Sequence, residues 1–375
     1  MQTIKLLQVI PALDSGGVEQ GTVDIAQGVV KKSGSSLVVS NGGRLVPRLK
    51  RCGSEHIELS VHSKNPWVIF RNIKKLREII DTHNINIIHT RSRAPAWSSY
   101  FAARGRIKIV STFHNVYGYG SSSKRYYNSG LARADAIIAI SNFVKNKIIE
   151  LYNIPRKKVK VIYRGIDEKY FINDDITEST LLNFIKENQI FTDKKIILYP
   201  ARLTPWKGQI EFLEILKKLD SNDYFCIFVG DEKNQKYSEK LKKKIVDLKL
   251  NSSCKVMGHI SDMKCMYKIS HLVVSASQKP EGFGRVVAEA MAMEKPVVAY
   301  DHGGVSEQMQ TYDKSFRIPF MDQAGMVNAI NIALSMSKEA MNQIVLSPKE
   351  FVNKNFTRKE MVENTYQLYK NLLKK

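Results

Sequence analysis

The chain has 375 residues, of which 43% are hydrophobic and 25% are charged, as in an ordinary globular protein of two or at most three domains. Lysine and arginine outnumber aspartate and glutamate by 58 to 36, which gives a formal net charge of +22. Four cysteines without a C-x-x-C pair argue against a disulfide scaffold or a structural zinc site, and no apolar run approaches the roughly 18 residues that a membrane span requires. No signal peptide is visible, so we expect a protein of the reducing cytoplasm that is soluble or lies on a membrane.

Short β-branched runs alternate with amphipathic stretches in the first half of the chain. Helices are predicted at Val18–Lys32, which Gly34 ends, and at Trp67–Thr82, where apolar residues recur every three to four positions. Strands that alternate with helices of this length form βαβ units with a parallel sheet. The predicted strands are Ile4–Ile10, Leu37–Ser40, Ile85–His89, Ile107–Phe113, Ala136–Ile140 and Val159–Tyr163.

A polar segment, Asn173–Asp193, interrupts this pattern and predicts a linker with a short helix. The chain is therefore predicted to form two doubly wound α/β domains, residues 1–172 and 173–357, with a final helix at 358–375 that packs back toward the first domain. Ligands of doubly wound sheets bind beyond the carboxyl ends of the strands, so the loops there are candidate sites. The second domain's predicted strands are Ile196–Pro200, Tyr224–Val229, Lys255–Met257, His271–Ser275 and Pro296–Tyr300.

The positive charge is concentrated in the first domain. Residues 1–170 contain 28 basic and 11 acidic residues, a net charge of +17, whereas the remaining 205 residues have a net charge of +5. A uniform bias toward lysine would explain a basic total but not this asymmetry. The asymmetry favours a basic face for a polyanion, which could be nucleic acid, anionic lipid headgroups or a phosphorylated glycolipid.

Two loops that follow predicted strands contain residues suited to phosphate. Gly16 and Gly17 would let backbone N–H groups approach an anion, although many strand-to-helix turns use glycine for the turn alone. Arg202 and Lys207 lie beyond another strand end, where a guanidinium fork and an ammonium group together suit a diphosphate. A solvated basic loop would have the same sequence.

The segment Pro280–Met291 is the most informative. Glu281 lies in a glycine-rich loop, and Glu289 lies eight residues later in the helix that this loop opens. Free N–H groups at the helix start could hold a phosphate, and a carboxylate within the helix can accept hydrogen bonds from sugar hydroxyls. The alternative is a pair of exposed glutamates, which the sequence Gly282-Phe-Gly284 makes a poorer explanation.

Taken together, these motifs resemble the retaining glycosyltransferases of family 4, whose GT-B fold has two Rossmann-like domains facing each other across a cleft. The resemblance covers essentially the whole chain, and although each motif is weak alone, the ordered set is specific. The motifs are Gly16-Gly17, Thr112-Phe-His114-Asn115, Ala139-Ile-Ser141, Gly165-Ile-Asp167, Arg202 with Lys207-Gly208, Val229-Gly230-Asp231, Glu281 with Glu289, and Pro296-Val-Val-Ala299.

The resemblance implies that the second domain binds a nucleoside-diphosphate sugar and the first binds the acceptor. Arg202 and Lys207 would stabilise the charge on the departing diphosphate. Glu289 would bind the ribose and Glu281 the transferred sugar, while His114 would orient that sugar near its anomeric centre. The other implied donor contacts are Gly16 and Gly17 at the distal phosphate, Gly258 and Ile260 at the base, and Gly230, Phe283, Gly284, Arg285 and Val286.

No metal or other cofactor is expected, because arginine and lysine would neutralise the diphosphate and neither loop contains D-x-D. Two residues depart from the family pattern. Arg164 stands where asparagine is usual, and Arg285 stands where an apolar residue is commoner, so that it either contacts a phosphate or is solvated. The resemblance implies that the anomeric configuration of the sugar is retained. We favour front-face displacement, with the leaving phosphate as base, over double displacement, because Glu281 is better placed as a sugar ligand than as a nucleophile.

Basic and aromatic residues occur together in several loops of the first domain. This combination suits a membrane interface and a phosphorylated glycolipid, although surface cations with aromatics in the core would give the same sequence. We expect an anionic glycolipid acceptor, such as lipopolysaccharide core or a polyprenyl-diphosphate sugar, at the anionic inner face of the cytoplasmic membrane. The residues concerned are Arg44, Arg48 and Arg51, Arg91 and Arg93 before Trp97, and the segment 117–127.

Two other functions fit the sequence less well. A GT-B enzyme that epimerises or hydrolyses a sugar nucleotide would turn over the donor without an acceptor, and it matches the loops poorly. A non-enzymatic polyanion-binding protein would explain the charge but not the ordered motifs. No nucleic-acid-binding module is visible, so nucleic acid is not expected as a partner. The donor base and sugar, the linkage and the oligomeric state stay open.

Overall fold

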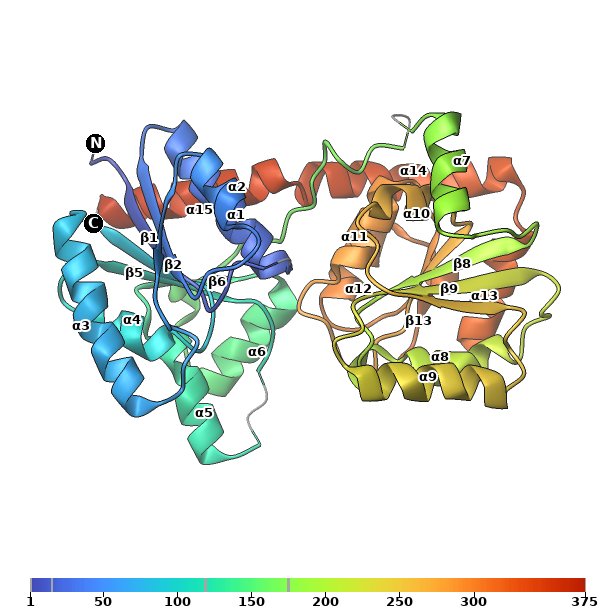
Figure 1. The fold of residues 1–375 in the computed structure, drawn as a ribbon, viewed down its shortest axis with the longest axis horizontal. Coiled ribbons are helices and arrows are strands. Elements are labelled where there is room, and N and C mark those ends of the chain that lie inside the picture. The colour runs from blue at the N-terminus through green and yellow to red at the C-terminus, as the bar shows by residue number, and fades with distance from the viewer. Residues whose placement is uncertain (1, 15, 118–119, 174–175, 375) are drawn as a thin grey trace. The chain divides into compact units, whose positions relative to one another are not determined.

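The computed structural model describes residues 2–14, 16–117, 120–173 and 176–374 (Figure 1). The chain divides into two compact units, Met1–Gly165 with Arg358–Lys375 (unit 1) and Ile166–Thr357 (unit 2). The division therefore falls before Ile166, not after residue 172 as predicted. The reason is that Ile166 forms a β-bridge with Thr357, and its N–H donates to the Phe356 carbonyl at 2.8 Å, so the chain joins unit 2 before the polar segment begins.

Unit 1 is built on a seven-stranded parallel sheet of order β3-β2-β1-β4-β5-β6-β7. Six of its strands lie within two residues of their predicted bounds. The strand that was not predicted, β3, has the sequence Glu-His-Ile-Glu at one edge of the sheet, where a single apolar residue gives little pattern. The strands are β1 (Lys5–Val9), β2 (Ser35–Ser40), β3 (Glu55–Glu58), β4 (Ile87–Thr90), β5 (Lys108–Phe113), β6 (Ala136–Ala139) and β7 (Val159–Val161).

Helices cover both faces of this sheet (Figure 1). On one face, α1 (Gly17–Lys31) packs with α15 (Arg358–Leu373), the helix that ends the described chain. Met361 and Tyr369 of α15 are buried in the core of unit 1, and the Tyr369 hydroxyl hydrogen-bonds to His89 of β4. The C-terminal helix is thus part of unit 1. The remaining helices are α2 (Val46–Arg51), α3 (Pro66–Thr82), α4 (Ala96–Ala103), α5 (Ser122–Asn128) and α6 (Asn142–Tyr152).

Unit 2 contains a six-stranded parallel sheet of order β10-β9-β8-β11-β12-β13. The strands are β8 (Lys195–Pro200), β9 (Tyr224–Val229), β10 (Cys254–Met257), β11 (Leu272–Ser275), β12 (Val297–Tyr300) and β13 (Arg317–Ile318). The helices are α7 (Glu178–Glu187), α8 (Gln209–Leu216), α9 (Gln235–Asp247), α10 (Met263–Ile269), α11 (Arg285–Ala292), α12 (Gly304–Gln308), α13 (Gln323–Ser335) and α14 (Lys338–Asn355).

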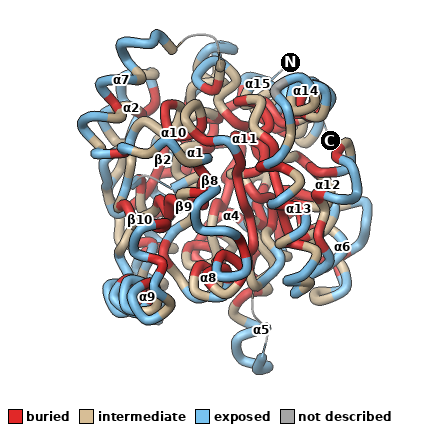
Figure 2. The backbone as a smooth tube through the Cα atoms, turned by 90° about the vertical axis from the view of Figure 1, so that its right-hand side faces the viewer, coloured by how far each residue is buried: buried red, intermediate tan, exposed pale blue. Residues whose placement is uncertain are grey.

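Burial follows this layering in each unit. Figure 2 shows buried backbone concentrated in the strands and exposed backbone on the outer turns of helices such as α9. Among the helices of the described chain, none has the length and apolar character that crossing a bilayer demands. The neighbouring strands β8 and β11 end at the same edge of the unit 2 sheet, so the loops that follow them are brought together.

Candidate active site

The loops after β8 and β11 join Lys207 to Glu281. The Lys207 ammonium donates to Glu281 Oε1 at 2.7 Å, and the Ser277 hydroxyl donates to the same oxygen at 2.7 Å. Lys207 is only 8% exposed, and its ammonium also lies 4.4 Å from the centre of the Trp206 ring. Two of the predicted catalytic residues, 74 positions apart in the sequence, therefore form one buried ion pair.

Glycines allow these loops to approach each other. Gly208 has a φ of +80°, and a Cβ there would lie 2.5 Å from the Ala276 carbonyl oxygen in the loop after β11. At Gly230, a Cβ would lie 2.0 Å from the Ala201 carbonyl oxygen in the loop after β8. Only glycine fits such contacts without displacing backbone, so both positions set the spacing of the loops around Lys207.

Competing effects fix the ionisation of Glu281. Burial alone would raise its pKa, but the Lys207 charge and the hydrogen bonds from Lys207 and Ser277 outweigh burial and hold the pKa below its ordinary value of 4.5. The carboxylate is therefore ionised at neutral pH, when Lys207 is its counter-ion. A carboxylate engaged in this way is suited to accepting hydrogen bonds from a ligand.

We expect Glu281→Gln to lower the free energy of unfolding at neutral pH by about 3 kcal/mol, because the buried Lys207 charge loses its partner. Since the folded-state pKa of Glu281 is depressed, the contribution of the pair is complete above its ordinary pKa of 4.5 and is lost as pH falls through the depressed value. The difference between the two proteins, measured by urea unfolding at a series of pH values, should be constant near neutrality and narrow below pH 4.5.

The matched control is Glu214→Gln, which breaks the surface pair of Glu214 with Lys244, 2.8 Å apart. Exposed pairs contribute little to stability, so this change should have a small effect at every pH. If the two substitutions lowered the free energy of unfolding equally at neutral pH, the buried pair would not stabilise the protein more than the surface pair does.

Glu289 lies in the second turn of α11 and is buried. The Tyr267 hydroxyl donates to its Oε2 at 3.0 Å, and the Arg285 guanidinium pairs with its Oε1 at 2.8 Å. The Arg285 side chain stays 37% exposed, so its pairing with Glu289 adds a contact that was not among the two alternatives expected from the sequence. In this structure it fixes the Glu289 carboxylate one helical turn away.

The glycine-rich loop precedes α11 and turns into it through a left-handed glycine. Gly284 is the N-cap of α11 with a φ of +88°, and Phe283 is buried against Phe356. Arg285 and Val286 are the first two residues of the helix, where N–H groups have no intrahelical acceptor. The start of α11 therefore offers N–H groups that can donate to a polar group of a ligand.

Two residues near Glu281 were missed in the sequence. Ser277 donates to the carboxylate, and His302, in the loop after β12, contributes to lowering its pKa. The signal for His302 was Asp301-His-Gly-Gly, a polar and glycine-rich loop after a strand, which is the same kind of signal that identified the other loops.

The other donor-site candidates of unit 2 occupy neighbouring loops without joining the ion pair. Arg202 follows β8 and is exposed, with no ion pair among the described residues. Gly258 and Ile260 follow β10, the strand beside β9. A Cβ at Gly258 would meet only the Glu232 carboxylate, at 3.6 Å, so this loop has room beside its backbone.

In unit 1, His114 and Arg91 lie at the carboxyl ends of the adjacent strands β5 and β4. Arg91 is 1% exposed, yet its Nε and one terminal nitrogen have no hydrogen-bond partner. Neither ring nitrogen of His114 makes a hydrogen bond of normal geometry. Burial, followed by the nearby charges of Arg164 and Arg91, holds the pKa of His114 well below its usual value, so the ring is neutral at neutral pH.

The same unit contains the predicted glycine turn. Gly16 is the N-cap of α1, and Gly17 is its first residue, after β1. The residue before them lies outside the described residues. A Cβ at Gly16 would overlap the Glu19 carboxylate, so that side chain folds over the turn in this structure.

The predicted acceptor and membrane residues separate into different environments. Arg44 and Arg51 are exposed, but Arg48 pairs with Asp24 at 3.3 Å. Trp97 is 9% exposed and was wrongly assigned to the membrane interface. Its indole N–H donates to the Tyr127 carbonyl at 2.9 Å, so it is a core residue of α4.

Arg93 is half-buried against unit 1 and does not project freely. Its guanidinium lies 4.1 Å from the centre of the Tyr117 ring and donates to Asn128 Oδ1 at 3.3 Å. Of the segment 117–127, residues 118 and 119 lie outside the described residues, while Tyr126 is exposed and stacks on Trp97. The basic and aromatic residues singled out in the sequence thus do not form a single exposed surface.

Known protein families and solved structures match both units of the chain. The family described as "Glycosyl transferases group 1" matches residues 182–346, and "Glycosyltransferase Family 4" matches residues 15–170. A crystal structure of a glycosyltransferase from Rickettsia africae ESF-5 is 36% identical, with a TM-score of 0.91 and complete coverage of both chains. The chain belongs to glycosyltransferase family 4. It has the GT-B fold of two Rossmann-like domains, as predicted.

More distant relatives of this glycosyltransferase carry more specific descriptions. Anabaena Alr3699/HepE, solved in complex with UDP-glucose, is 21% identical with a TM-score of 0.83, and the match covers 98% of this chain and 100% of that one. The lipopolysaccharide 1,2-N-acetylglucosaminetransferase of Salmonella typhimurium is 25% identical over 317 residues, 82% of this chain and 78% of that protein.

Proposed function

We propose that this glycosyltransferase moves a sugar from a nucleoside-diphosphate sugar to an anionic glycan or glycolipid, with retention of anomeric configuration. The observation that carries the proposal is the buried pair of Lys207 and Glu281 at the carboxyl edge of the unit 2 sheet, with Glu289 buried in the helix that follows. The UDP-glucose named for the Anabaena structure supports a donor of this class.

In this proposal, Lys207 and Arg202 bind the diphosphate and stabilise the negative charge that grows on it as the sugar leaves. Glu281 accepts hydrogen bonds from the transferred sugar, together with the backbone at Phe283 and Gly284. Glu289 accepts hydrogen bonds from the ribose. The cations do the work that a metal ion does in other enzymes, so no metal or cofactor is required.

Further donor contacts complete this assignment. The base lies against the loop of Gly258 and Ile260, and Gly230 keeps the loop after β9 clear of the diphosphate. The N–H groups of Arg285 and Val286 face the donor at the start of α11, while Gly16 and Gly17 provide N–H groups for the distal phosphate.

Unit 1 provides the groups for the acceptor and for the sugar's reacting carbon. His114 is neutral, so it orients the donor sugar by hydrogen bonding without adding charge. The unpartnered nitrogens of Arg91, in a unit with a large excess of cations, support an acceptor that carries a carboxylate or a phosphate. Lipopolysaccharide core is such an acceptor, and the name of the Salmonella relative supports it.

The mechanism we propose is a front-face displacement in which the bond to the departing phosphate breaks as the acceptor oxygen attacks from the same side. The leaving phosphate oxygen takes the acceptor proton. Glu281 is held at one oxygen by Lys207 and Ser277, an arrangement that suits a sugar ligand better than a nucleophile that must form a covalent bond.

The test is the release of nucleoside diphosphate from a panel of sugar nucleotides, with and without lipopolysaccharide core acceptors. A transferase releases diphosphate at a rate that depends on acceptor, and nuclear magnetic resonance of the product reports the anomeric configuration. Release that does not depend on acceptor would instead identify a hydrolase, and conversion of the sugar without release an epimerase. An inverted product would contradict the retaining mechanism.

A further inference from the structure

A pocket of about 500 Å³ lies at the amino edge of the unit 2 sheet. Lys195 is the first residue of β8, and His271 and Pro296 directly precede β11 and β12. All three residues line the pocket. Because these strands are parallel and neighbouring, they begin at one edge of the sheet, opposite the edge where the loops of Lys207 and Glu281 follow β8 and β11. The pocket is therefore separate from the candidate active site.

Three lysines give this pocket a positive charge. Lys195, Lys268 of α10 and Lys295 line it, and none of the three forms an ion pair within the described part of the chain. Lys268 and Lys295 are half-buried. Glu294 is the one carboxylate among the described lining residues, and it pairs with Lys349. The pocket thus gathers three ammonium groups to which unit 2 offers no ion-pair partner of their own.

Backbone carbonyls hold these ammonium groups in place. The Lys295 ammonium donates to the Lys268 carbonyl at 2.8 Å, and the Lys268 ammonium donates to the Asn173 carbonyl at 3.0 Å. Lys195 donates to the Leu334 carbonyl. An ammonium group has three N–H bonds, so donors remain at each lysine for a ligand.

His271 and the start of α14 add uncharged donors. The Ile196 N–H donates to His271 Nδ1 at 3.0 Å, so the proton of the neutral ring is on Nε2. Burial, followed by the charges of Lys295 and Lys195, lowers the pKa of His271, so the ring is neutral at pH 7. Ser337, the N-cap of the 18-residue helix α14, also lines the pocket, which brings the free N–H groups of the first helical turn to its wall.

Apolar side chains complete the lining. Leu334 of α13, Met336 and Met341 at the start of α14, and Ile269 of α10 all line the pocket. A pocket of this volume accommodates a small organic molecule, with apolar walls for its body and a few polar groups that fix its orientation. Cations beside apolar side chains therefore favour an organic anion over a bare inorganic ion.

We propose that this pocket binds a small organic phosphate monoester. Lys195, Lys268 and Lys295 hold the phosphate group, whose three terminal oxygens accept from several donors at once. The His271 Nε2–H donates as well, and the organic part lies against the apolar side chains of α13 and α14, such as Leu334. The proposal goes beyond the proposed function and does not depend on it, because the ligand occupies neither the donor loops nor unit 1.

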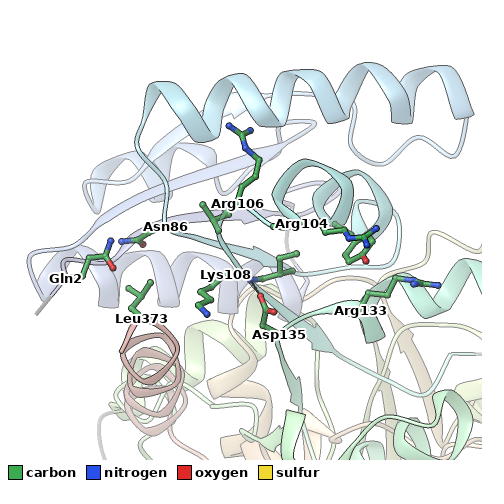
Figure 3. A pocket seen from close by; sticks show the side chains of 12 residues that line it. Gln2, Asn86, Arg104, Arg106, Lys108, Arg133, Asp135 and Leu373 are labelled. Carbon is green, nitrogen blue, oxygen red and sulfur yellow. Dashed lines mark hydrogen bonds between the residues drawn. The ribbon is translucent and has the colours of Figure 1, made fainter. Parts of the chain in front are cut away.

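A hollow of similar volume in unit 1 provides the matched control. Figure 3 shows this hollow of about 540 Å³, which Arg104, Lys108 and Arg133 line. The two guanidinium groups each lie 5.7 Å from the centre of the Tyr100 ring. Asp135, for which no ion pair is found among the described residues, also lines this hollow, and its negative charge opposes an anion.

Calorimetric titration with glycerol 3-phosphate, inorganic phosphate and glycerol tests the pocket at low salt. We expect saturable binding of glycerol 3-phosphate, weaker binding of inorganic phosphate and none of glycerol. Lys268→Met/Lys295→Met should weaken glycerol 3-phosphate binding about tenfold or more, because hydrogen bonds from two charged groups are lost. The exposed Lys195→Met should weaken it by about threefold to tenfold. Arg104→Met/Arg133→Met removes the same charge from the unit 1 hollow and should leave binding within about twofold of the parent.

The affinity should depend on the protonation of Lys295. Burial, followed by the Lys268 charge, lowers the pKa of Lys295 to about 8, against the opposing effect of Glu294. The ligand binds the protonated amine, so its affinity should fall about five- to tenfold between pH 7 and pH 9, where His271 is neutral throughout. Lys295→Arg, which stays protonated, should bind with little change over the same range.

Amine labelling of the parent protein provides a readout that requires no variant. Acetic anhydride acetylates unprotonated amines, and mass spectrometry of the peptides gives the rate at each lysine. Bound glycerol 3-phosphate should slow the acetylation of Lys268 and Lys295 several-fold and leave Lys108 of the unit 1 hollow unchanged. Equal protection of Lys108 and Lys295, or no protection of Lys295 at a saturating concentration, would overturn the proposal.

The donor loops also suit phosphate, so the titration is repeated on Lys207→Ala, which should retain the affinity of the pocket. Loss of glycerol 3-phosphate binding in Lys207→Ala together with full retention in Lys268→Met/Lys295→Met would assign the ligand to the donor site and overturn the proposal. No saturable binding, or equal affinity for inorganic phosphate, would also overturn it. Diphosphate release from sugar nucleotides tests the proposed function separately, because the pocket residues do not touch the donor loops.

Discussion

Replacing Lys207 by alanine is expected to lower kcat by about 10² to 10³-fold, the effect of removing one charged group that stabilises a developing negative charge in a buried site. Two effects act together. The diphosphate loses a cation, and the Glu281 carboxylate loses the partner that lies 2.7 Å away, so burial then raises the pKa of Glu281. Steady-state kinetics with saturating acceptor measure the change directly.

Lys233→Ala is the matched control for Lys207→Ala. Lys233 lies in the neighbouring loop after β9, is exposed and pairs with Asp231 at 3.4 Å. Its removal changes the same charge a short distance away and should alter kcat by no more than about twofold. If the two substitutions lowered kcat equally, the general charge of the loops, and not the buried ammonium of Lys207, would be responsible.

Gly208→Ala is expected to lower the free energy of unfolding by about 2–4 kcal/mol and to reduce donor affinity with it. Alanine at a φ of +80° is strained, and its Cβ would lie 2.5 Å from the Ala276 carbonyl oxygen. Relief of this overlap separates the loops after β8 and β11, which hold Lys207 and Glu281 together. Urea unfolding and titration with nucleoside diphosphate measure the two effects.

Gly105→Ala separates strain from overlap. Gly105 has a similar φ of +72°, but a Cβ there would have nothing within 4 Å. This substitution should cost only the strain of a left-handed alanine, about 1–2 kcal/mol, without an effect on donor binding. A loss of stability at Gly208 that did not exceed the loss at Gly105 would show that the absence of a Cβ at Gly208 is not what lets the two loops lie close together.

Strands of the sheets were predictable because parallel strands buried on both faces form uninterrupted β-branched runs. The two that were missed, β3 and β13, lie at sheet edges, where Glu55–Glu58 and Arg317–Ile318 offer little apolar sequence. The boundary between the units differs from the predicted boundary for another reason. A backbone hydrogen bond between Ile166 and Phe356 joins residues far apart in the sequence, and no local pattern indicates it.

The candidate site was predictable where glycine and charge follow a strand end, as at Lys207 and Glu281. Which charges pair could not be inferred, since that depends on the register of distant loops. Arg285 and Glu289 are the exception, because positions i and i+4 of a helix are neighbours and their ion pair could have been predicted. Aromatic residues were the least informative, because Trp67 and Trp97 look alike in the sequence and only packing shows that one is exposed and the other buried.

The central claim is that unit 2 binds a nucleoside-diphosphate sugar through Lys207, Glu281 and Glu289. The most direct test measures the melting temperature with and without UDP-, GDP-, ADP- and CMP-sugars. It is made on the parent protein, on Glu289→Ala, and on Glu239→Ala, which replaces an exposed glutamate of α9. A ligand that binds only the folded state raises the melting temperature. We predict a rise with one class of nucleoside-diphosphate sugar, and none with the CMP-sugars, which have a single phosphate. Glu239→Ala should retain this rise and Glu289→Ala should lose it. A rise that Glu289→Ala retains in full, or no rise with any donor, would contradict the claim.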